Sequence, residues 1–509
     1  MNANISSTAR AGYYTSLSRE NILTGLILLA GFLLRLRQYL TGRSLWLDEA
    51  MLALNIVNRR FGDLFKPLDY DQGAPIGFML VEKIFSLIFG TNEFSLRLFP
   101  LMVGLGSLWM FYLLLKHFTH DAGLWIGLAL FAFNPRLIYY SSEVKQYIVD
   151  VAMTILLLLI AMPLFQQPSR KRFATLTLIG LLALWFSHPS LFILAGIGLS
   201  LSRFYFQKRD YKNLGLTVGM GVLWLMNVGF LSYLTLNDLR HNSTMREYWQ
   251  GAFVPMPPWS DVNWYFSAFQ MNMESQFGIV YAAGLVFILM MAGWVTLFIQ
   301  KHEAAITISG IVFFTLVASS LGLYPLLERM GFFLVPIGIL MIAKSTEISA
   351  QRWRAYPIPS ALVLLVVSGF VFYGPVTRSL EQFITPKYFE HIRPTMSFLQ
   401  ESWKDGDAIF ISYGAVPAFG FYAPMYGLEN VSYVSGRRED YANPESILKR
   451  IEPLRNKPRV WVLLSHVYEK GNFNEKDFLI SHLDEIGDKK REFREPGTSV
   501  YLYLYDLAE

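Results

Sequence analysis

The 509-residue sequence contains no cysteine, which excludes disulfide bonds, thiolate catalysis and zinc sites built from cysteine. It is also poor in charge: Asp, Glu, Lys and Arg make up 16% of the chain, against about a quarter of a soluble domain. Hydrophobic residues account for 53%, and the mean hydropathy is +0.34. This composition predicts an integral membrane protein whose partners include membrane lipids.

The chain also lacks a large excess of either charge. The 44 Lys and Arg residues against 39 Asp and Glu residues leave a net charge of +5, which is too small to indicate a nucleic-acid partner. No internal repeat is visible, although such repeats are common in transporters. Because the net charge is so small, the basic residues are more informative as signals of membrane topology.

Long apolar runs dominate the first three quarters of the sequence. Because a span needs roughly 20 apolar residues, we expect about eleven membrane helices. They are predicted at 22–40, 94–116, 121–140, 146–165, 173–187, 190–206, 213–235, 276–300, 303–323, 329–346 and 357–376. His188-Pro189 separates two of them. The run 74–90 is shorter and carries Glu82 and Lys83, so we expect a helix that lies at the membrane interface.

Basic residues predict which loops face the cytoplasm. If 74–90 does not span, the basic loops at 170–172, 203–212 and 344–354 fall on the same side as the N-terminus. The positive-inside rule then makes that side cytoplasmic. The first long loop and everything after about residue 378 would lie on the opposite face.

The C-terminal part, 379–509, is polar enough to form a separate soluble unit. Strands are expected at 407–412, 430–434, 459–464 and 499–505, and helices near 393–403, 443–451 and 475–486. The predicted fold class is therefore mostly α: a polytopic helix bundle in residues 1–378, followed by a small α/β domain in residues 379–509.

Ionisable residues gather in the loops of the non-cytoplasmic face. The stretch SLWLDEAM places Asp48 and Glu49 side by side just after the first predicted span. The other candidates on this face are Asp71, Gln72, Arg97, Glu143, Lys145, Tyr147, His188 and Arg329. Charged groups at membrane depth are functional-site hypotheses by default. Carboxylates and cations together fit a reaction that needs a base and an anion-binding site.

Five stretches give the sequence a family resemblance: RSLWLDEA, DQGAPIGFML, FGTNEFSLRLFP, YYSSEVKQYIVD and YPLLERMGFFLVP. Their order and spacing, over most of residues 22–346, resemble polytopic glycosyltransferases that use a polyprenyl-phosphate-linked sugar. This group includes protein O-mannosyltransferases, the aminoarabinose transferases of lipid A and many bacterial relatives. The resemblance implies a periplasmic active site in a bacterial inner membrane, and the lack of cysteine suits a bacterial enzyme.

The chemistry of such a transfer gives the candidates their expected roles. A carboxylate must take the proton of the acceptor hydroxyl, and cations must stabilise the leaving phosphate. The resemblance places the base at Asp48 and implies an inverting reaction. We expect Glu49 and Glu143 as further catalytic carboxylates. Donor phosphate would be bound by Arg329, Lys145 and Arg97, and other parts of the substrates by Asp71, Gln72, Tyr147 and His188.

Simpler interpretations stand beside these roles. Asp48 could cap the following helix, Arg97 could anchor at the interface, and Arg329 could pair only with Glu328. Ion pairing could likewise account for Glu49, Glu143 and Lys145, and a turn for His188. Asp69 and Asp71 form a D-x-D pattern, a weak indicator of a divalent metal, so no metal or other cofactor is predicted.

Two other kinds of protein remain open at this point. One is a transporter or flippase of a lipid-linked glycan, and the other is a non-catalytic membrane subunit with a binding domain. The acceptor of a transferase could be a glycan, a lipid or a protein. The aromatic loop 236–275 could cover the site or simply lie in the interface.

Overall fold

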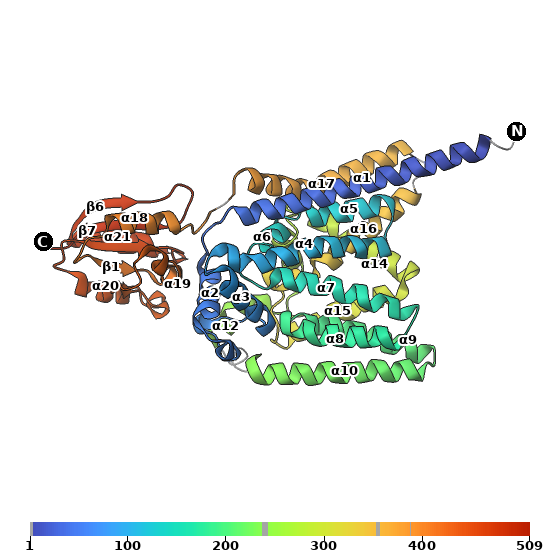
Figure 1. The fold of residues 1–509 in the computed structure, drawn as a ribbon, viewed down its shortest axis with the longest axis horizontal. Helices are drawn as coiled ribbons and strands as arrows, with labels where there is room; N and C mark the ends of the chain where they lie inside the picture. Colours follow the sequence, from blue (N-terminus) through green and yellow to red (C-terminus); the bar gives the residue numbers. More distant parts are fainter. Residues whose placement is uncertain (1–3, 237–242, 353–356, 387, 509) are drawn as a thin grey trace.

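The computed structural model describes the backbone of residues 4–236, 243–352, 357–386 and 388–508. It shows a bundle of long helices with a small α/β domain at one end (Figure 1). The N-terminus lies at the far end of the bundle and the C-terminus in the α/β domain. The expected fold class is confirmed.

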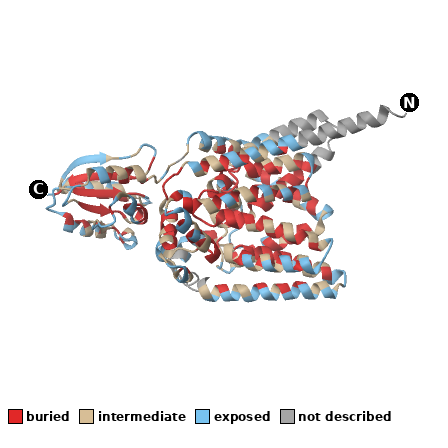
Figure 2. Cartoon of the chain, in the orientation of Figure 1, coloured by how far each residue is buried: buried red, intermediate tan, exposed pale blue. Residues whose placement is uncertain are grey.

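Long helices run roughly parallel or antiparallel through the bundle (Figure 1). They are α1 (Asn4–Leu40), α4 (Glu93–Phe118), α5 (Asp121–Ala132), α7 (Tyr147–Ala161), α8 (Arg170–Phe186), α9 (Ser190–Gln207), α10 (Tyr211–Leu231), α14 (Ala283–Gln300), α15 (His302–Ser320), α16 (Val335–Arg352) and α17 (Pro357–Ile384). Among the described residues, 8 helices are long and apolar enough to cross a membrane. Because α10 exposes most of its apolar residues at the edge of the bundle (Figure 2), its outer face is suited to lipid rather than to water.

Several predicted spans differ from the observed helices. The run 121–140 forms two helices, because Asn134 caps a new helix, α6 (Pro135–Tyr140), after the end of α5. The span predicted at 329–346 begins as a 3₁₀ helix, η6 (Glu328–Leu334). The break at His188-Pro189 is confirmed. Part of the span predicted at 357–376 lies outside the residues whose side chains are described.

Close helix contacts depend on small residues. A Cβ on Gly293 of α14 would lie 1.8 Å from the Met341 carbonyl oxygen of α16. Similarly, a Cβ on Gly310 of α15 would lie 3.0 Å from the Gly196 Cα of α9. Small residues let the backbones of membrane helices approach in this way. The first of these contacts holds α16, and with it the segment that carries Arg329, against α14.

Short helices cover the end of the bundle that faces the α/β domain (Figure 1). The first loop contributes α2 (Leu47–Asn58), η1 (Phe61–Phe65), η2 (Asp69–Asp71) and α3 (Ile76–Phe89). The loop after α10 contributes η4 (Ser232–Leu236), α12 (Ser243–Tyr248), η5 (Gln250–Ala252) and α13 (Val262–Ser275). As expected for 74–90, α3 has 14 residues, too few for a span.

The α/β domain contains a five-stranded sheet of order β2-β1-β3-β7-β6. Its strands are β1 (Ala408–Ile411), β2 (Val434–Ser435), β3 (Val460–Leu464), β6 (Asp488–Phe493) and β7 (Tyr501–Asp506), and a small hairpin adds β4 (Glu469–Lys470) and β5 (Phe473–Asn474). Strand β1 pairs in parallel with β2 and β3, and β7 pairs antiparallel with β3 and β6. The helices are α18 (Arg393–Ser402), α19 (Val416–Tyr422), α20 (Glu445–Ile451) and α21 (Glu475–Ile486).

Candidate active site

Asp48 lies in the first turn of α2 between two cations. Its carboxylate oxygens lie 3.0 Å from Lys145 Nζ and 2.8 Å from Arg329 Nη1. Burial alone would raise the pKa of Asp48, but Lys145 and Arg329 hold it at about 2. The helix is capped at Trp46 without a side-chain bond, so the interpretation of Asp48 as an N-cap is wrong. Three of the predicted site residues therefore meet in one cluster.

Glu49 points the other way, into the protein. Its fully buried carboxylate is 2.8 Å from Arg43 Nη1 and 2.6 Å from Arg97 Nη2, and it accepts the Val144 backbone N–H at 2.9 Å. Arg97 also donates to the backbone carbonyl oxygens of Arg43 and Ser44. Both side chains join α2, α4 and the loop that carries Glu143. Their expected roles in catalysis and phosphate binding stay predictions.

Glu143 faces a cavity. One of its oxygens accepts the Trp46 indole N–H at 2.8 Å, while the other has no hydrogen-bond partner among the described residues. Burial, together with the nearby negative charge of Glu49, raises the pKa of Glu143 to about 7. A carboxyl that titrates near neutral pH and keeps one oxygen free is suited to proton transfer or to hydrogen bonding with a sugar.

The predicted substrate-binding residues divide into two groups. Gln72 accepts a hydrogen bond from Lys145 Nζ at 2.7 Å, and the Tyr147 ring centre lies 5.9 Å from the Arg329 guanidinium carbon, so both adjoin the Asp48 cluster. Asp71 instead pairs with Arg438 of the α/β domain at 3.0 Å. His188 occupies the turn between α8 and α9, where burial lowers its pKa to about 4, and it does not line the cavity.

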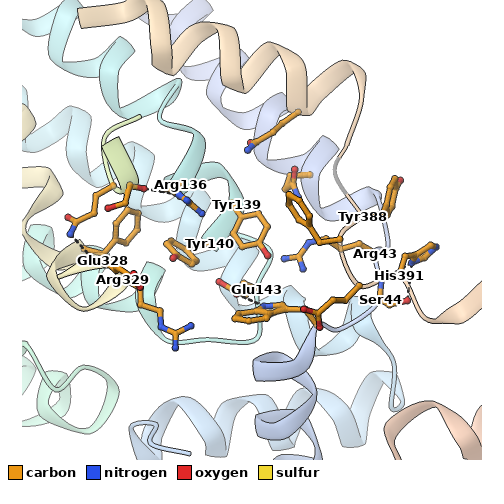
Figure 3. A pocket seen from close by; sticks show the side chains of 18 of the residues that line it. Arg43, Ser44, Arg136, Tyr139, Tyr140, Glu143, Glu328, Arg329, Tyr388 and His391 are labelled. Atoms are coloured by element: carbon orange, nitrogen blue, oxygen red, sulfur yellow. Dashed lines mark hydrogen bonds between the residues drawn. The ribbon is translucent and has the colours of Figure 1, made fainter. Parts of the chain in front are cut away.

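The cavity beside the cluster has a volume of about 570 Å³. Figure 3 shows Tyr139, Tyr140 and Glu143 between Arg329 on one side and Tyr388 and His391 on the other. Its wall combines aromatic rings with charged groups, a mixture that suits an amphiphilic, sugar-bearing ligand. From the aromatic loop, Trp249 lies 5.5 Å from the Arg329 guanidinium carbon, so part of this loop adjoins the Asp48 cluster. No group of three potential metal ligands occurs within the described ranges.

Sequence reasoning missed the contribution of the end of α17 and of the segment that follows it. The cavity is also lined by Gln382, Tyr388, Phe389, Glu390 and His391, all of which fall in the region predicted to be a separate domain. Their polar and aromatic character was visible in the sequence, but no motif linked them to Asp48. The predicted boundary at residue 378 lies inside α17, which continues to Ile384.

No protein-family model and no curated protein matches the chain. The crystal structure of ArnT from Cupriavidus metallidurans bound to undecaprenyl phosphate matches with a TM-score of 0.52 and 12% identity, over 96% of this chain and 98% of that one. The apo structure of the same protein gives 0.53 and 11%, with the same coverage.

An oligosaccharyltransferase from Archaeoglobus fulgidus matches with a TM-score of 0.49 and 11% identity, over 87% of this chain and 69% of that one. The two ArnT matches show that the chain has the polytopic membrane fold seen in ArnT. The resemblance inferred from the sequence motifs is confirmed at the level of the fold.

Proposed function

We propose that this protein is an inverting membrane glycosyltransferase that moves a sugar from a polyprenyl-phosphate donor to an acceptor hydroxyl. The observation that supports it most directly is the pairing of Asp48 with both Lys145 and Arg329 beside the cavity. These two ion pairs bring a candidate base together with two candidate phosphate ligands. The ArnT structure bound to undecaprenyl phosphate supports the class of donor.

The proposed reaction is a single displacement. The acceptor oxygen attacks the anomeric carbon, the bond from that carbon to the phosphate oxygen breaks, and Asp48 takes the hydroxyl proton. The polyprenyl phosphate leaves with the bonding electron pair, and its added negative charge is stabilised by Arg329 and Lys145. One attack on the face opposite the leaving group inverts the configuration of the sugar.

Donor binding would also activate the base. While Lys145 and Arg329 both pair with Asp48, its pKa of about 2 makes it a weak proton acceptor. A donor phosphate competes for the same two cations and loosens their hold on Asp48. Burial then raises the pKa of Asp48 toward the range of a useful base. In this way the carboxylate becomes basic only when the leaving group is in place.

The surroundings of the site fit a donor that stays in the membrane. The cluster lies where α2, the loop before α7 and η6 meet, at the end of the bundle nearest the α/β domain (Figure 1). The basic loops after α7 and α9 lie at the opposite end. By the positive-inside rule, the site would face the periplasm of a bacterial inner membrane. The acceptor would be a hydroxyl on a glycan, a lipid or a protein.

A transporter or flippase of a lipid-linked glycan is the alternative. Transporters commonly bind their substrates near the midplane, between broken helices. Here the charged cluster and the cavity lie at one end of the bundle, which favours chemistry at that face over passage across the membrane.

The test measures whether the protein consumes a polyprenyl-phosphate sugar donor. Purified protein in nanodiscs would be incubated with a panel of short-chain polyprenyl-phosphate sugars labelled in the sugar, with candidate acceptors and with heat-inactivated protein as the control. The proposal predicts that one donor is consumed with release of polyprenyl phosphate. Movement of an intact donor across liposome membranes, without consumption, would instead establish the flippase.

A further inference from the structure

The soluble domain contacts the segment that carries Asp48. Residues 43–46 form the extended approach to α2, which begins at Leu47. Three backbone N–H groups in residues 43–47 bond to the C-terminal part of the chain. The N–H of Ser44 donates to His391 Nδ1 at 3.2 Å, and that of Leu45 donates to the Tyr422 hydroxyl at 2.8 Å. The Tyr422 hydroxyl in turn donates to Glu93 of α4 at 2.7 Å.

The contact nearest to Asp48 is made by Glu390. The Leu47 N–H, at the first position of α2, donates to Glu390 Oε2 at 2.7 Å. Trp46, the N-cap residue, supplies no side-chain bond of its own, so Glu390 takes the part of a capping carboxylate from a distant segment. A negative charge at this position also interacts favourably with the helix dipole. Asp48 is the next residue along the chain.

His466 holds Glu390 in place. This histidine lies between β3 and β4, and its Nδ1 is 2.7 Å from Glu390 Oε1. The hydrogen bond to Glu390 raises the pKa of His466, with further contributions from Asp48 and Glu475. The His466 ring centre lies 6.5 Å from that of Trp46, whose indole donates to Glu143. One carboxylate oxygen of Glu390 therefore bonds to α2, and the other bonds to the soluble domain.

We propose that Glu390, locked by His466, is a positioning residue that fixes the first turn of α2 and thereby sets Asp48 and Trp46 in their working orientation. The soluble domain is then part of the catalytic machinery, because it supplies the second half of this clamp. The inference rests on the proposed transferase function for its kinetic test, but its structural test is independent of any activity.

The experiment compares Glu390→Ala, Glu390→Gln and His466→Ala in the full-length protein in nanodiscs. Glutamine keeps an oxygen that accepts the Leu47 N–H, so Glu390→Gln should resemble wild type, whereas Glu390→Ala removes the cap. The matched control is Glu452→Ala, which removes an exposed carboxylate whose ion pair is with Arg455 of the same short segment. Transfer is assayed with the short-chain polyprenyl-phosphate sugar that wild type consumes, and amide hydrogen exchange is followed in the peptide that contains Leu47 and Asp48.

The expected result for Glu390→Ala is a kcat about tenfold lower with donor KM within about twofold of wild type, because orientation is lost and donor binding is not. Exchange in the first turn of α2 should be about fivefold faster, as for loss of a helix cap. His466→Ala should show both effects more weakly. Glu390→Gln should recover most of the activity, and Glu452→Ala should match wild type.

Wild-type kcat in Glu390→Ala would overturn the inference, and so would a lower kcat with unchanged exchange. If Glu390→Gln is as damaged as Glu390→Ala, keeping an acceptor for the Leu47 N–H is not sufficient, and the inference that this cap fixes α2 is likewise refuted. If wild type consumes no donor, the proposed function fails, whereas the exchange measurement still decides whether Glu390 fixes α2.

Discussion

At the scale of single residues, the central feature is the competition for Lys145 and Arg329. Both cations pair with Asp48, and both are proposed to bind the donor phosphate. The earlier alternative, that Arg329 pairs only with Glu328, is wrong, since its ion pair is with Asp48. The residue is also surrounded by the rings of Trp46, Tyr147 and Trp249. A planar guanidinium suits this site better than an ammonium does.

Substituting Arg329 should therefore weaken donor binding even when the charge is kept. For Arg329→Ala we expect donor affinity to fall roughly tenfold to a hundredfold, in line with about 1.5–3 kcal/mol for a hydrogen bond to a charged group. The donor affinity of Arg329→Lys should lie between that of wild type and that of Arg329→Ala. The control is Arg203→Lys, which makes the same change beside Glu303 at the other end of the bundle. If Arg329→Ala and Arg329→Lys both had the same donor dissociation constant as Arg203→Lys and wild type, Arg329 would not be a ligand of the donor phosphate.

Glu143 should make the stability of the protein depend on pH. Its pKa is raised in the folded state to about 7, so folding favours the protonated carboxyl. The resulting stabilisation is complete below the unfolded pKa, near 4.5, and is lost as the pH rises through about 7. Glu143→Gln lacks this titration. Melting curves in detergent from pH 4.5 to 8 should therefore show wild type losing stability relative to Glu143→Gln, and parallel curves would contradict this account.

At the scale of elements, the Glu49 ion pairs join α2 to α4 and to the loop before α7. Glu49→Gln would leave Arg43 and Arg97 buried with weaker partners, and removing one member of a buried pair costs about 3–5 kcal/mol. We expect a clearly lower melting temperature. Asp63→Asn, which removes an exposed ion pair with Lys66 in the same loop, should change it little. Similar melting temperatures for the two variants would show that the Glu49 cluster is not a structural anchor.

Local pattern predicted most elements, and its failures have physical causes. The long apolar runs gave the membrane helices, because burial in lipid requires little beyond length and hydropathy. The break after α5 depends on the Asn134 cap and Pro135, which lie within an apolar run. Strand β6, with the sequence DKKREF, is exposed and exists only through its pairing with β7. Helix α19 is short and mixes Pro, Gly and aromatic residues, and its packing against α2 is a long-range effect.

At the scale of the whole molecule, sequence predicted the three members of the Asp48 cluster and the presence of the α/β domain, but not that residues beyond 378 complete the wall of the cavity. Motifs in neighbouring loops identified Asp48, Lys145 and Arg329 because each is a charge at the same membrane face. Glu390, His391 and His466 reach the site only because the α/β domain docks on the bundle. Such docking leaves no periodic signal in the sequence, so the division at residue 378 separated parts that share one site.

The topology of the whole chain makes a direct prediction. Lys171, at the start of α8, and Glu381, near the end of α17, should lie on opposite sides of the membrane, with Lys171 in the cytoplasm. Reporter fusions that distinguish cytoplasm from periplasm would test this at both positions. If both positions reported the same side, the proposed periplasmic location of the site would be refuted.

The central claim, that Asp48 deprotonates the acceptor beside a bound donor phosphate, is tested most directly by single-turnover transfer with Asp48→Asn at saturating donor. The asparagine keeps the shape of the side chain but cannot take the proton, so the rate should fall by roughly 10²–10⁴-fold. Donor affinity should be equal to or higher than that of wild type, because Lys145 and Arg329 no longer pair with a carboxylate. A near-normal rate in correctly folded Asp48→Asn protein would contradict the account.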